Sequence, residues 1–266
     1  MLPQGVTILL LGIDARPGEG MLARSDALLV VRLDPQNRVV GMLSLPRDLW
    51  VAMPGMGEGK INSAFYLAEN AAPGTGPEIA RQTISNALGI PIDHHVVVDF
   101  RGFRDLIDAL EGVAVDVPSE LYDAQFPTED YGYTVAHFLP GRQTMDGATA
   151  LTYSRIRHPD SDFQRMQRQQ AVIMGLARTL QSRNLLTTLA AADQLTASLQ
   201  PYVHTDMTRE QIVRLLWGLR SLDVGQVQQL VVDGAMLEET SIGGAYALVA
   251  DAATLQQMGQ VLIRGQ

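Results

Sequence analysis

Continuous apolar runs alternate along this chain with segments in which apolar residues recur at helical spacing, a pattern typical of an α/β fold. The run from Val6 to Gly12 ends in glycine and predicts a buried central strand. Two β-rich runs, Ala27 to Leu33 and Arg38 to Leu45, are joined by a turn at residues 34–37 and predict an antiparallel hairpin. Further strands are expected at His95 to Phe100, Val113 to Val117 and Val227 to Val232.

Helical spacing and helix-breaking residues define the remaining elements. Helices are expected at Lys60 to Asn70, Glu78 to Leu88, Phe103 to Leu110, Asp146 to Thr152, Leu185 to Leu199, Arg209 to Leu222 and Ala250 to Ile263, and after Ser161. Residues 55–59 form a glycine-rich loop, and residues 118–142 predict an irregular but ordered surface segment with room for a small hairpin. No repeat or linker interrupts the chain, so we expect a single layered α/β domain over residues 1–266, with a mixed central sheet flanked by helices.

The stretch from Tyr153 to Gln170 concentrates four arginines in an acidic chain. Arg155 and Arg157 alternate on one face of an extended segment. Arg165, Arg168 and Gln169 share one face of the helix that follows, which Ser161 or Asp162 can cap. Guanidinium groups beside the free N–H groups of a helix end favour a bound anion such as phosphate.

Salt bridges on a solvated face are the alternative for these arginines. The nearby carboxylates, Asp146, Asp160 and Asp162, are too few to neutralise the whole cluster, which favours an external anion. His158 lies nearest to the cluster, but its place in a turn before proline favours a structural role.

The hairpin predicted above brings a second charged group together. Its two outer ends carry Arg24 and Asp26 on one side, and Arg47 and Asp48 on the other. Asp14 follows the first strand and reaches a neighbouring strand end. Two carboxylates beside several arginines suit Mg²⁺ bridged to phosphate oxygens, with salt bridging as the alternative.

The amino-acid composition restricts the classes of binding partner and of site that this chain can have. The net charge of -9 and the pI of about 5.0 argue against non-specific binding to nucleic acid or to an anionic membrane. Cysteine is absent, which excludes disulfides, zinc-thiolate sites and cysteine nucleophiles. The early apolar run is too short to span a bilayer, so residues 1–266 are expected to be soluble. Lys60 is the single lysine beside nineteen arginines.

Seven short motifs follow one another through residues 6–181. They read ILLLGIDAR, RSDALLVV, SLPRD, GKINSA, VVVDFRGF, YSRIR and DFQRMQRQQ, with a weaker TDMTREQ in the part from 182 to 266. In order and spacing this set resembles the LytR-CpsA-Psr family of bacterial cell-wall enzymes. The chain departs from the family at Glu69-Asn70 and at Glu111-Gly112, where the family usually has Gly-Gly pairs, and this affects loop geometry more than chemistry.

The resemblance implies a phosphotransferase that moves a glycopolymer from a polyprenyl-pyrophosphate carrier to peptidoglycan. It implies Mg²⁺ as cofactor, with Mn²⁺ as the alternative ion, and an apolar tunnel for the lipid tail. It further implies a place at the extracytoplasmic face of the bacterial cell membrane, with a membrane helix that precedes residue 1, and no nucleic-acid partner.

The family's site residues can be transferred position by position. The metal-facing aspartates would be Asp14 and Asp26, and the catalytic residues Arg47, Asp48, Arg155 and Arg157. Pyrophosphate would be bound by Arg24, Arg47, Lys60, Asn62, Arg155, Arg157, Arg165, Arg168 and Gln169; Asp162 also matches a motif position. Asp48 or another carboxylate is the candidate base for the acceptor hydroxyl.

Three functions stay open on the sequence. A polyprenyl-pyrophosphate hydrolase differs from the transferase only in that water replaces the sugar hydroxyl, and a non-catalytic binding module for an anionic lipid is the third. The tunnel is expected along two apolar faces, although a solid core is the alternative. These faces comprise Val172, Ile173, Leu176 and Leu180, and Phe103, Leu106, Ile107 and Leu110.

Overall fold

The computed structural model describes residues 5–15, 22–37, 39–128, 132–157, 160–183 and 201–265. The chain divides into two compact units, of which the first comprises Met1–Phe100 and Gln200–Gln266 and the second Arg101–Leu199. The single domain expected over the whole chain stays a prediction. The helix expected at Leu185 to Leu199 lies outside the described residues.

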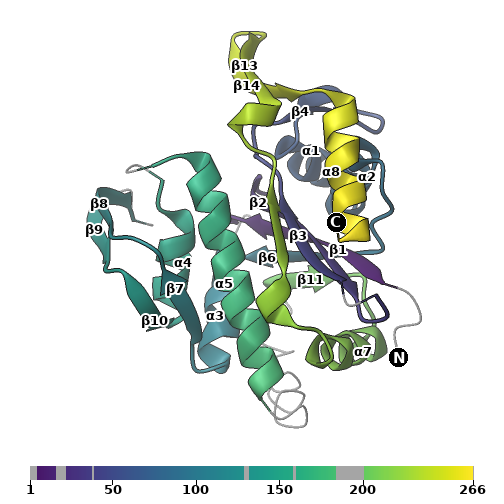
Figure 1. The fold of residues 1–266 in the computed structure, drawn as a ribbon. Helices are drawn as coiled ribbons and strands as arrows, with labels where there is room; N and C mark the ends of the chain where they lie inside the picture. The colour runs from purple at the N-terminus through teal and green to yellow at the C-terminus, as the bar shows by residue number, and fades with distance from the viewer. Residues whose placement is uncertain are drawn as a thin grey trace. The chain divides into compact units, whose positions relative to one another are not determined.

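The first unit is built on a mixed sheet, as expected (Figure 1). Among the described residues, six strands follow the order β11-β6-β1-β2-β3-β12. β1 runs parallel to β6, and β3 parallel to β12, whereas β1–β2, β2–β3 and β6–β11 are antiparallel. The strands are β1 (Val6–Ile13), β2 (Ser25–Asp34), β3 (Val39–Ser44), β6 (His94–Asp99), β11 (Val203–Thr205) and β12 (Gln228–Val231). The predicted hairpin is therefore confirmed as β2–β3.

Both faces of this sheet are covered by helices, which explains why β1 is a continuous apolar run rather than an alternating one. Leu9, Leu11 and Ile13 pack with α1 (Ser63–Ala71), α2 (Gly76–Leu88) and α8 (Ala252–Arg264). The intervening residues Val6, Ile8 and Leu10 pack on the opposite side with α7 (Arg209–Arg220). No helix within the described ranges is long and apolar enough to cross a membrane.

Two hairpins of the first unit differ from the sequence expectation. The expected helix is confirmed as α1, although it begins at Ser63 rather than at Lys60. The expected loop at 55–59 is wrong for residues 57–59, because β4 (Trp50–Met53) pairs with β5 (Gly57–Lys60). Gly55 and Gly57 adopt φ values of 72° and 77°, which suit glycine and allow the tight turn. The second, β13 (Leu237–Ile242) with β14 (Ala245–Ala250), was not expected; 3₁₀ turns at Val224–Gln226 and Gly234–Met236 precede it.

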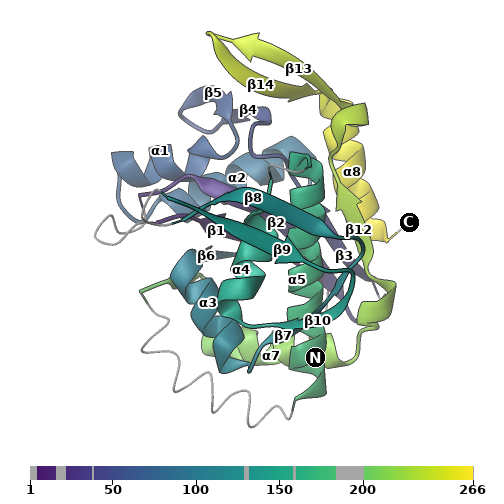
Figure 2. The ribbon, with the colours of Figure 1, turned by 90° about the vertical axis from the view of Figure 1, so that its left-hand side faces the viewer.

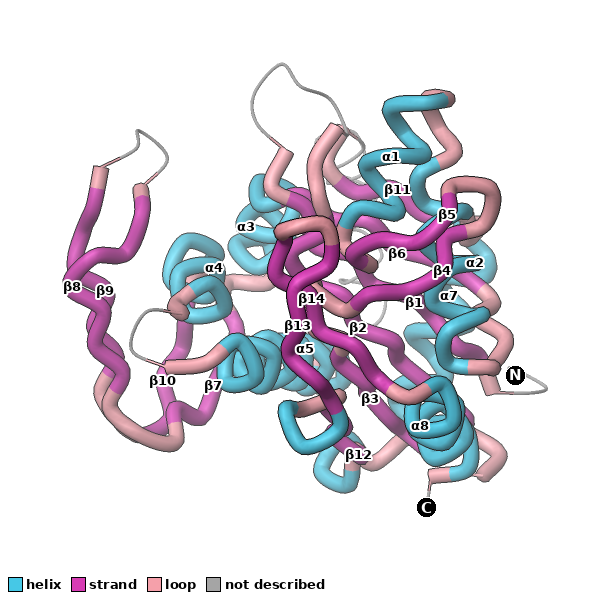
Figure 3. The backbone as a smooth tube through the Cα atoms, turned by 90° about the horizontal axis from the view of Figure 1, so that it is seen from above, coloured by secondary structure: helices cyan, strands magenta, loops and turns pink. Residues whose placement is uncertain are grey.

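Among its described residues, the second unit combines helices with two β-ribbons (Figures 2 and 3). β7 (Val113–Val117) pairs with β10 (Gly141–Met145), and β8 (Leu121–Pro127) with β9 (Tyr133–Phe138). The segment 118–142 is thus mostly strand. The expected small hairpin is confirmed, and less of the segment is irregular than the sequence predicted. The helices in the described part of this unit are α3 (Phe100–Ala109), α4 (Gly147–Arg155) and α5 (Asp162–Ser182). α5 lies close against β7, because a Cβ atom at Gly175 would meet the Ala114 carbonyl oxygen at 2.7 Å.

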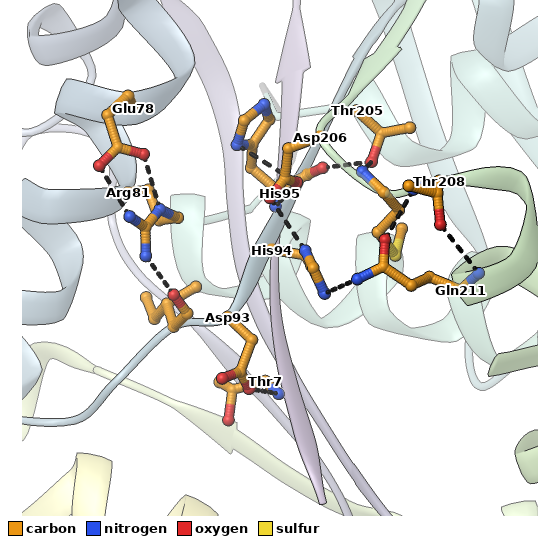
Figure 4. A network of polar contacts seen from close by, with 12 residues as sticks. Thr7, Glu78, Arg81, Asp93, His94, His95, Thr205, Asp206, Thr208 and Gln211 are labelled. Atoms are coloured by element: carbon orange, nitrogen blue, oxygen red, sulfur yellow. Dashed lines mark hydrogen bonds and ion pairs between the residues drawn. The ribbon is translucent and has the colours of Figure 1, made fainter. Parts of the chain in front are cut away.

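A polar network in the first unit ties β6 to the segment that leads into α7 (Figure 4). The carboxylate of Asp206 accepts a hydrogen bond from the His95 backbone N–H at 2.9 Å and contacts His94 Nδ1 at 2.9 Å. His94 Nε2 lies 3.3 Å from the amide nitrogen of Gln211, whose Oε1 accepts from the Thr208 N–H at 2.7 Å. Because that amide nitrogen is a donor, His94 Nε2 acts as the acceptor. The hydrogen-bond network therefore assigns the ring proton of His94 to Nδ1, which faces Asp206.

This network predicts a pH-dependent stability. Burial lowers the pKa of His95 from its ordinary value of 6.5; Asp206 and Glu78 oppose that shift, while Arg81 and His94 add to it. In the unfolded chain His95 takes up a proton near pH 6.5, whereas in the folded chain it stays neutral to lower pH. The stabilising contribution of neutral His95 is therefore present above pH 6.5 and is lost as the pH falls. The melting temperature should drop between pH 7.5 and 5.5, and His95→Gln should reduce that drop. An equal drop in melting temperature in wild type and His95→Gln would show that His95 does not cause the pH dependence.

Candidate functional site

A β-bulge at the start of β2 sets the first group of charged side chains. Gly12 of β1 faces Ala27, but the next residue, Ile13, faces Ser25, so Asp26 is the extra residue on the bulged strand. Bulges redirect a side chain away from the regular ladder. Asp14 follows β1 directly, so the predicted placement of Asp14 and Asp26 at neighbouring strand ends is confirmed.

Arg47 comes to the same place because it follows β3, which ends just before Pro46. Its Nη1 donates to Asp26 Oδ1 at 2.6 Å. A backbone hydrogen bond stabilises the turn that carries Arg47, because the Asn62 N–H donates to the Arg47 carbonyl oxygen at 3.3 Å. The Ser25 N–H in turn donates to the Asn62 carbonyl oxygen at 3.3 Å, which links this turn to the start of β2.

Lys60 extends the group from the end of β5. Its Nζ lies 2.6 Å from Asp48 Oδ1, while Arg47 Nε lies 3.8 Å from Asp48 Oδ2. Asp26, Arg47, Asp48 and Lys60 thus form a chain of alternating charges, which we call the strand-end cluster. Their side chains are 23% to 32% exposed, so the charges are held in place yet reachable from solvent. Arg24, at the edge of β2, is exposed.

The strand-end cluster fits a hard divalent cation in its donor chemistry. Asp26 uses Oδ1 for Arg47, and a carboxylate binds a guanidinium and a cation through different oxygens. Asn62 is 5% exposed, and its Oδ1 is buried without a hydrogen-bond partner in the described part of the chain. Within that same part, no group of three or more histidine, aspartate or glutamate side chains is arranged to hold a metal by itself. Magnesium often takes only one or two carboxylates and completes its shell with phosphate and water.

The four arginines between Tyr153 and Gln170, in the second unit, divide into two pairs. Arg168 is nearly buried and holds Asp160 with two contacts, Nη1 to Oδ2 at 2.5 Å and Nη2 to Oδ1 at 3.0 Å. Its Nη2 also donates to the Ile156 carbonyl oxygen at 2.5 Å. Arg165, also nearly buried, lies 2.8 Å from Asp162. The carboxylates counted as too few in the sequence therefore engage two of the four arginines.

Arg155 and Arg157 form the other pair, at the end of α4. Arg155 is the last residue of that helix, and its guanidinium carbon lies 5.5 Å from the centre of the Phe126 ring, a cation–π contact. Tyr153 anchors the helix in the core, where its ring meets Phe138 edge-on at 5.1 Å. Arg157 is exposed. This pair is suited to an external anion, whereas Arg168 closes the loop before α5.

Two smaller expectations concern the start of α5. Ser161 is its N-cap, since the hydroxyl accepts from the Gln164 N–H at 3.3 Å, so the first of the two predicted caps is confirmed. Gln169 donates to the Ser154 carbonyl oxygen at 3.4 Å and joins α5 to α4. His158 lies outside the described residues.

The sequence reasoning missed two aromatic contacts of site residues. Phe126 under Arg155 belongs to a segment that was expected to be mostly irregular. Tyr246 lies beside Lys60, with Nζ 5.9 Å from the ring centre, and belongs to the unexpected hairpin β13–β14. The Gly243-Gly244 pair directly before the apolar run AYALVA is the signal that could have revealed that hairpin.

The sequence of this chain is similar to a known protein family and to individual proteins. Residues 3–264 match the LytR_cpsA_psr family. The chain is 33% identical over 220 residues to the regulatory protein MsrR of Staphylococcus aureus, which covers 81% of this chain and 61% of that protein. It is 34% identical over 206 residues to the polyisoprenyl-teichoic acid–peptidoglycan teichoic acid transferase TagV of Bacillus subtilis, covering 76% of this chain and 49% of TagV. The chain therefore spans about three fifths and about half of the length of these relatives.

Solved structures show the same fold. The crystal structure of B. subtilis TagV superimposes with a TM-score of 0.78 at 28% identity, over 98% of this chain and 97% of that one. TagT bound to LIIa-WTA gives a TM-score of 0.77 at 27% identity, over 98% of this chain and 90% of that one.

Proposed function

Because the chain belongs to the LytR_cpsA_psr family, we propose that it transfers a glycopolymer from a polyprenyl-pyrophosphate carrier to peptidoglycan. The activity for which TagV is named, teichoic acid transfer between polyisoprenyl-teichoic acid and peptidoglycan, supports this proposal. The observation that carries it is the strand-end cluster, where Arg47 and Lys60 are each held at 2.6 Å by a carboxylate. Such fixed cations suit the oxygens of a pyrophosphate.

The proposed reaction is a single displacement at phosphorus. The acceptor hydroxyl of peptidoglycan attacks the phosphorus next to the glycan, and the bond from that phosphorus to the bridging oxygen breaks. Polyprenyl phosphate leaves with the bonding electron pair, and the hydroxyl proton passes to a base. The protein has little covalent chemistry to do in such a transfer, so positioning and charge neutralisation carry most of the catalysis.

The charged residues of the two units are proposed to have different roles in this transfer. Arg47 and Lys60 are proposed to bind phosphate oxygens and to stabilise the charge that gathers on the leaving group. Asp48 contacts both of these cations, which favours a role in positioning Lys60. Arg155 and Arg157 of the second unit are proposed to bind the same class of anion, and Arg24, Asn62, Arg165, Arg168 and Gln169 stay predictions as pyrophosphate ligands.

Asp14 and Asp26 are proposed to hold a Mg²⁺ ion, with Mn²⁺ as the alternative, and Asn62 Oδ1 is a further oxygen donor nearby. When bound, the ion would neutralise phosphate charge and lower the cost of the displacement. Asp26 orients Arg47 through its Oδ1 in either case.

The lipid tail is proposed to lie in an apolar tunnel of the second unit. Ile107 and Val172 are fully packed in the core of that unit, and Leu110 is buried as well. Phe103, Leu106, Ile173, Leu176 and Leu180 are only partly buried on α3 and α5. These five side chains are the proposed tunnel lining, and each buried methylene of a polyprenyl chain would add about 0.8 kcal/mol. We propose that the enzyme acts at the extracytoplasmic face of the cell membrane, and an anchoring helix outside residues 1–266 stays a prediction.

One assay separates transfer from hydrolysis. Turnover of a lipid-pyrophosphate glycan is measured by the release of lipid phosphate, with and without peptidoglycan. Transfer predicts release that depends on the acceptor, whereas release at the same rate without acceptor would show a hydrolase. Tight lipid binding without any turnover would show a binding module.

Lys60→Ala should weaken binding of farnesyl pyrophosphate about tenfold, because one charged contact to phosphate is lost. Lys60→Arg should be partly tolerated, since the charge remains but the fork geometry differs. Isothermal titration calorimetry measures both, with Arg264→Ala on the surface of α8 as control. Unchanged affinity in Lys60→Ala would remove Lys60 from the phosphate site.

A further inference from the structure

The hairpin β13–β14 is fastened to the strand-end cluster. The Leu248 N–H donates to the Asp48 carbonyl oxygen at 3.0 Å, and Leu248 forms a parallel bridge with Leu49. Ala247 is 0% and Leu248 is 6% exposed, so this part of β14 is packed into the unit. Figure 2 shows the hairpin beside β4 and β5. The hairpin therefore has a fixed position beside Asp48 and Lys60.

Tyr246 stands on the same face of β14 as Leu248, two residues away. Its ring centre lies 5.9 Å from Lys60 Nζ, which itself is 2.6 Å from Asp48 Oδ1. Although the next two residues of β14, Ala247 and Leu248, are buried, Tyr246 is 48% exposed. Tyr246 is thus a half-exposed aromatic residue at the edge of a cluster proposed to bind phosphate.

A single exposed aromatic ring needs no function, and a cation–π contact at this distance is weak. Two observations together go beyond that reading. The hairpin is anchored on the backbone of a cluster residue, and the ring extends from that anchor over the lysine of the same cluster. A rigid aromatic face next to a phosphate-binding cation is suited to a sugar joined to that phosphate, because the ring can cover the apolar C–H face of the sugar.

We infer that Tyr246 stacks on a sugar ring next to the phosphate bound by Lys60 and thereby selects glycan-bearing substrates. The inference rests on the proposed function and adds a specificity residue to it. The sugar could come from the donor, as the first sugar after the pyrophosphate, or from the peptidoglycan acceptor.

Binding measurements separate these sources without turnover. Affinities of wild type, Tyr246→Ala and Tyr246→Phe are measured by calorimetry for three probes. They are farnesyl pyrophosphate, the same lipid pyrophosphate carrying N-acetylglucosamine, and a soluble disaccharide fragment of peptidoglycan. Trp217→Ala is the control, because Trp217 is an exposed aromatic residue on α7 of the same unit, with 63% exposure.

Tyr246→Ala should weaken one sugar-bearing probe about fivefold and leave farnesyl pyrophosphate unchanged, while Tyr246→Phe and Trp217→Ala stay near wild type. A loss for the lipid-linked sugar assigns the ring to the donor, and a loss for the disaccharide assigns it to the acceptor. Equal losses for farnesyl pyrophosphate and its glycosylated form would show that the ring acts only through Lys60, and no loss for any probe would also overturn the inference. If the sugar-dependent loss occurs in a protein without transfer activity, the proposed function fails while the sugar contact stands.

Discussion

Arg155→Ala and Arg157→Ala should each lower the rate of transfer at least about tenfold, while the melting temperature stays within a few degrees of wild type. Each arginine would provide a charge-assisted contact to phosphate, worth roughly 2 to 4 kcal/mol in the transition state. Neither side chain is nearly buried as Arg165 and Arg168 are, so the fold should tolerate its loss. Steady-state kinetics and thermal unfolding of the same preparations measure both quantities.

Two further variants make this test specific. Arg178→Ala on α5 removes an arginine whose guanidinium lies 3.7 Å from Asp116, and it should keep wild-type activity and stability. Arg168→Ala should instead lower the free energy of unfolding by about 3 to 5 kcal/mol, because Asp160 is left as a nearly buried charge without its partner. If Arg155→Ala and Arg157→Ala unfold like Arg168→Ala, with unchanged activity per folded molecule, these arginines are structural.

Asp14→Asn and Asp26→Asn should each raise the magnesium concentration needed for half-maximal activity about tenfold, because a neutral amide is a poor ligand for a hard cation. Asp26→Asn should also lower the rate at saturating magnesium, since the ion pair with Arg47 at 2.6 Å is weakened. Binding of Mn²⁺, followed by electron paramagnetic resonance, tests the same site without turnover. Asp251→Asn is the matched control, because that aspartate makes no side-chain capping hydrogen bond. Unaltered metal dependence in both site variants would refute the metal assignment.

The strand-end cluster could be largely predicted because it depends on strand pairing. The β2–β3 hairpin necessarily brings its two outer ends together, and Pro46 stops the second strand, so Asp26, Arg47 and Asp48 were expected as neighbours. The 2.6 Å contact between Arg47 and Asp26 confirms this. The bulge that leaves Asp26 unpaired in the ladder depends on a one-residue register shift, which apolar alternation alone does not show.

Other features could not be read from local pattern. Residues 57–60 read GEGK, whose glycines suggested a loop, yet cross-strand pairing with residues 50–53 makes them a strand. Counting carboxylates near the arginines gave too little weight to geometry, because Asp160 alone engages two nitrogens of Arg168. Tyr246 is distant from Lys60 in sequence, and only the anchoring of β14 on Asp48 brings the two together.

The fate of the phosphorus next to the glycan tests the central claim most directly. A lipid-pyrophosphate glycan labelled with ³²P at that phosphorus is incubated with the protein, Mg²⁺ and peptidoglycan, and the lipids are then extracted. Transfer predicts that the label stays with peptidoglycan in a phosphodiester resistant to phosphomonoesterase, and that Arg47→Ala abolishes this incorporation. Label released as a phosphatase-sensitive glycan phosphate, in equal amounts with and without peptidoglycan, would contradict the account.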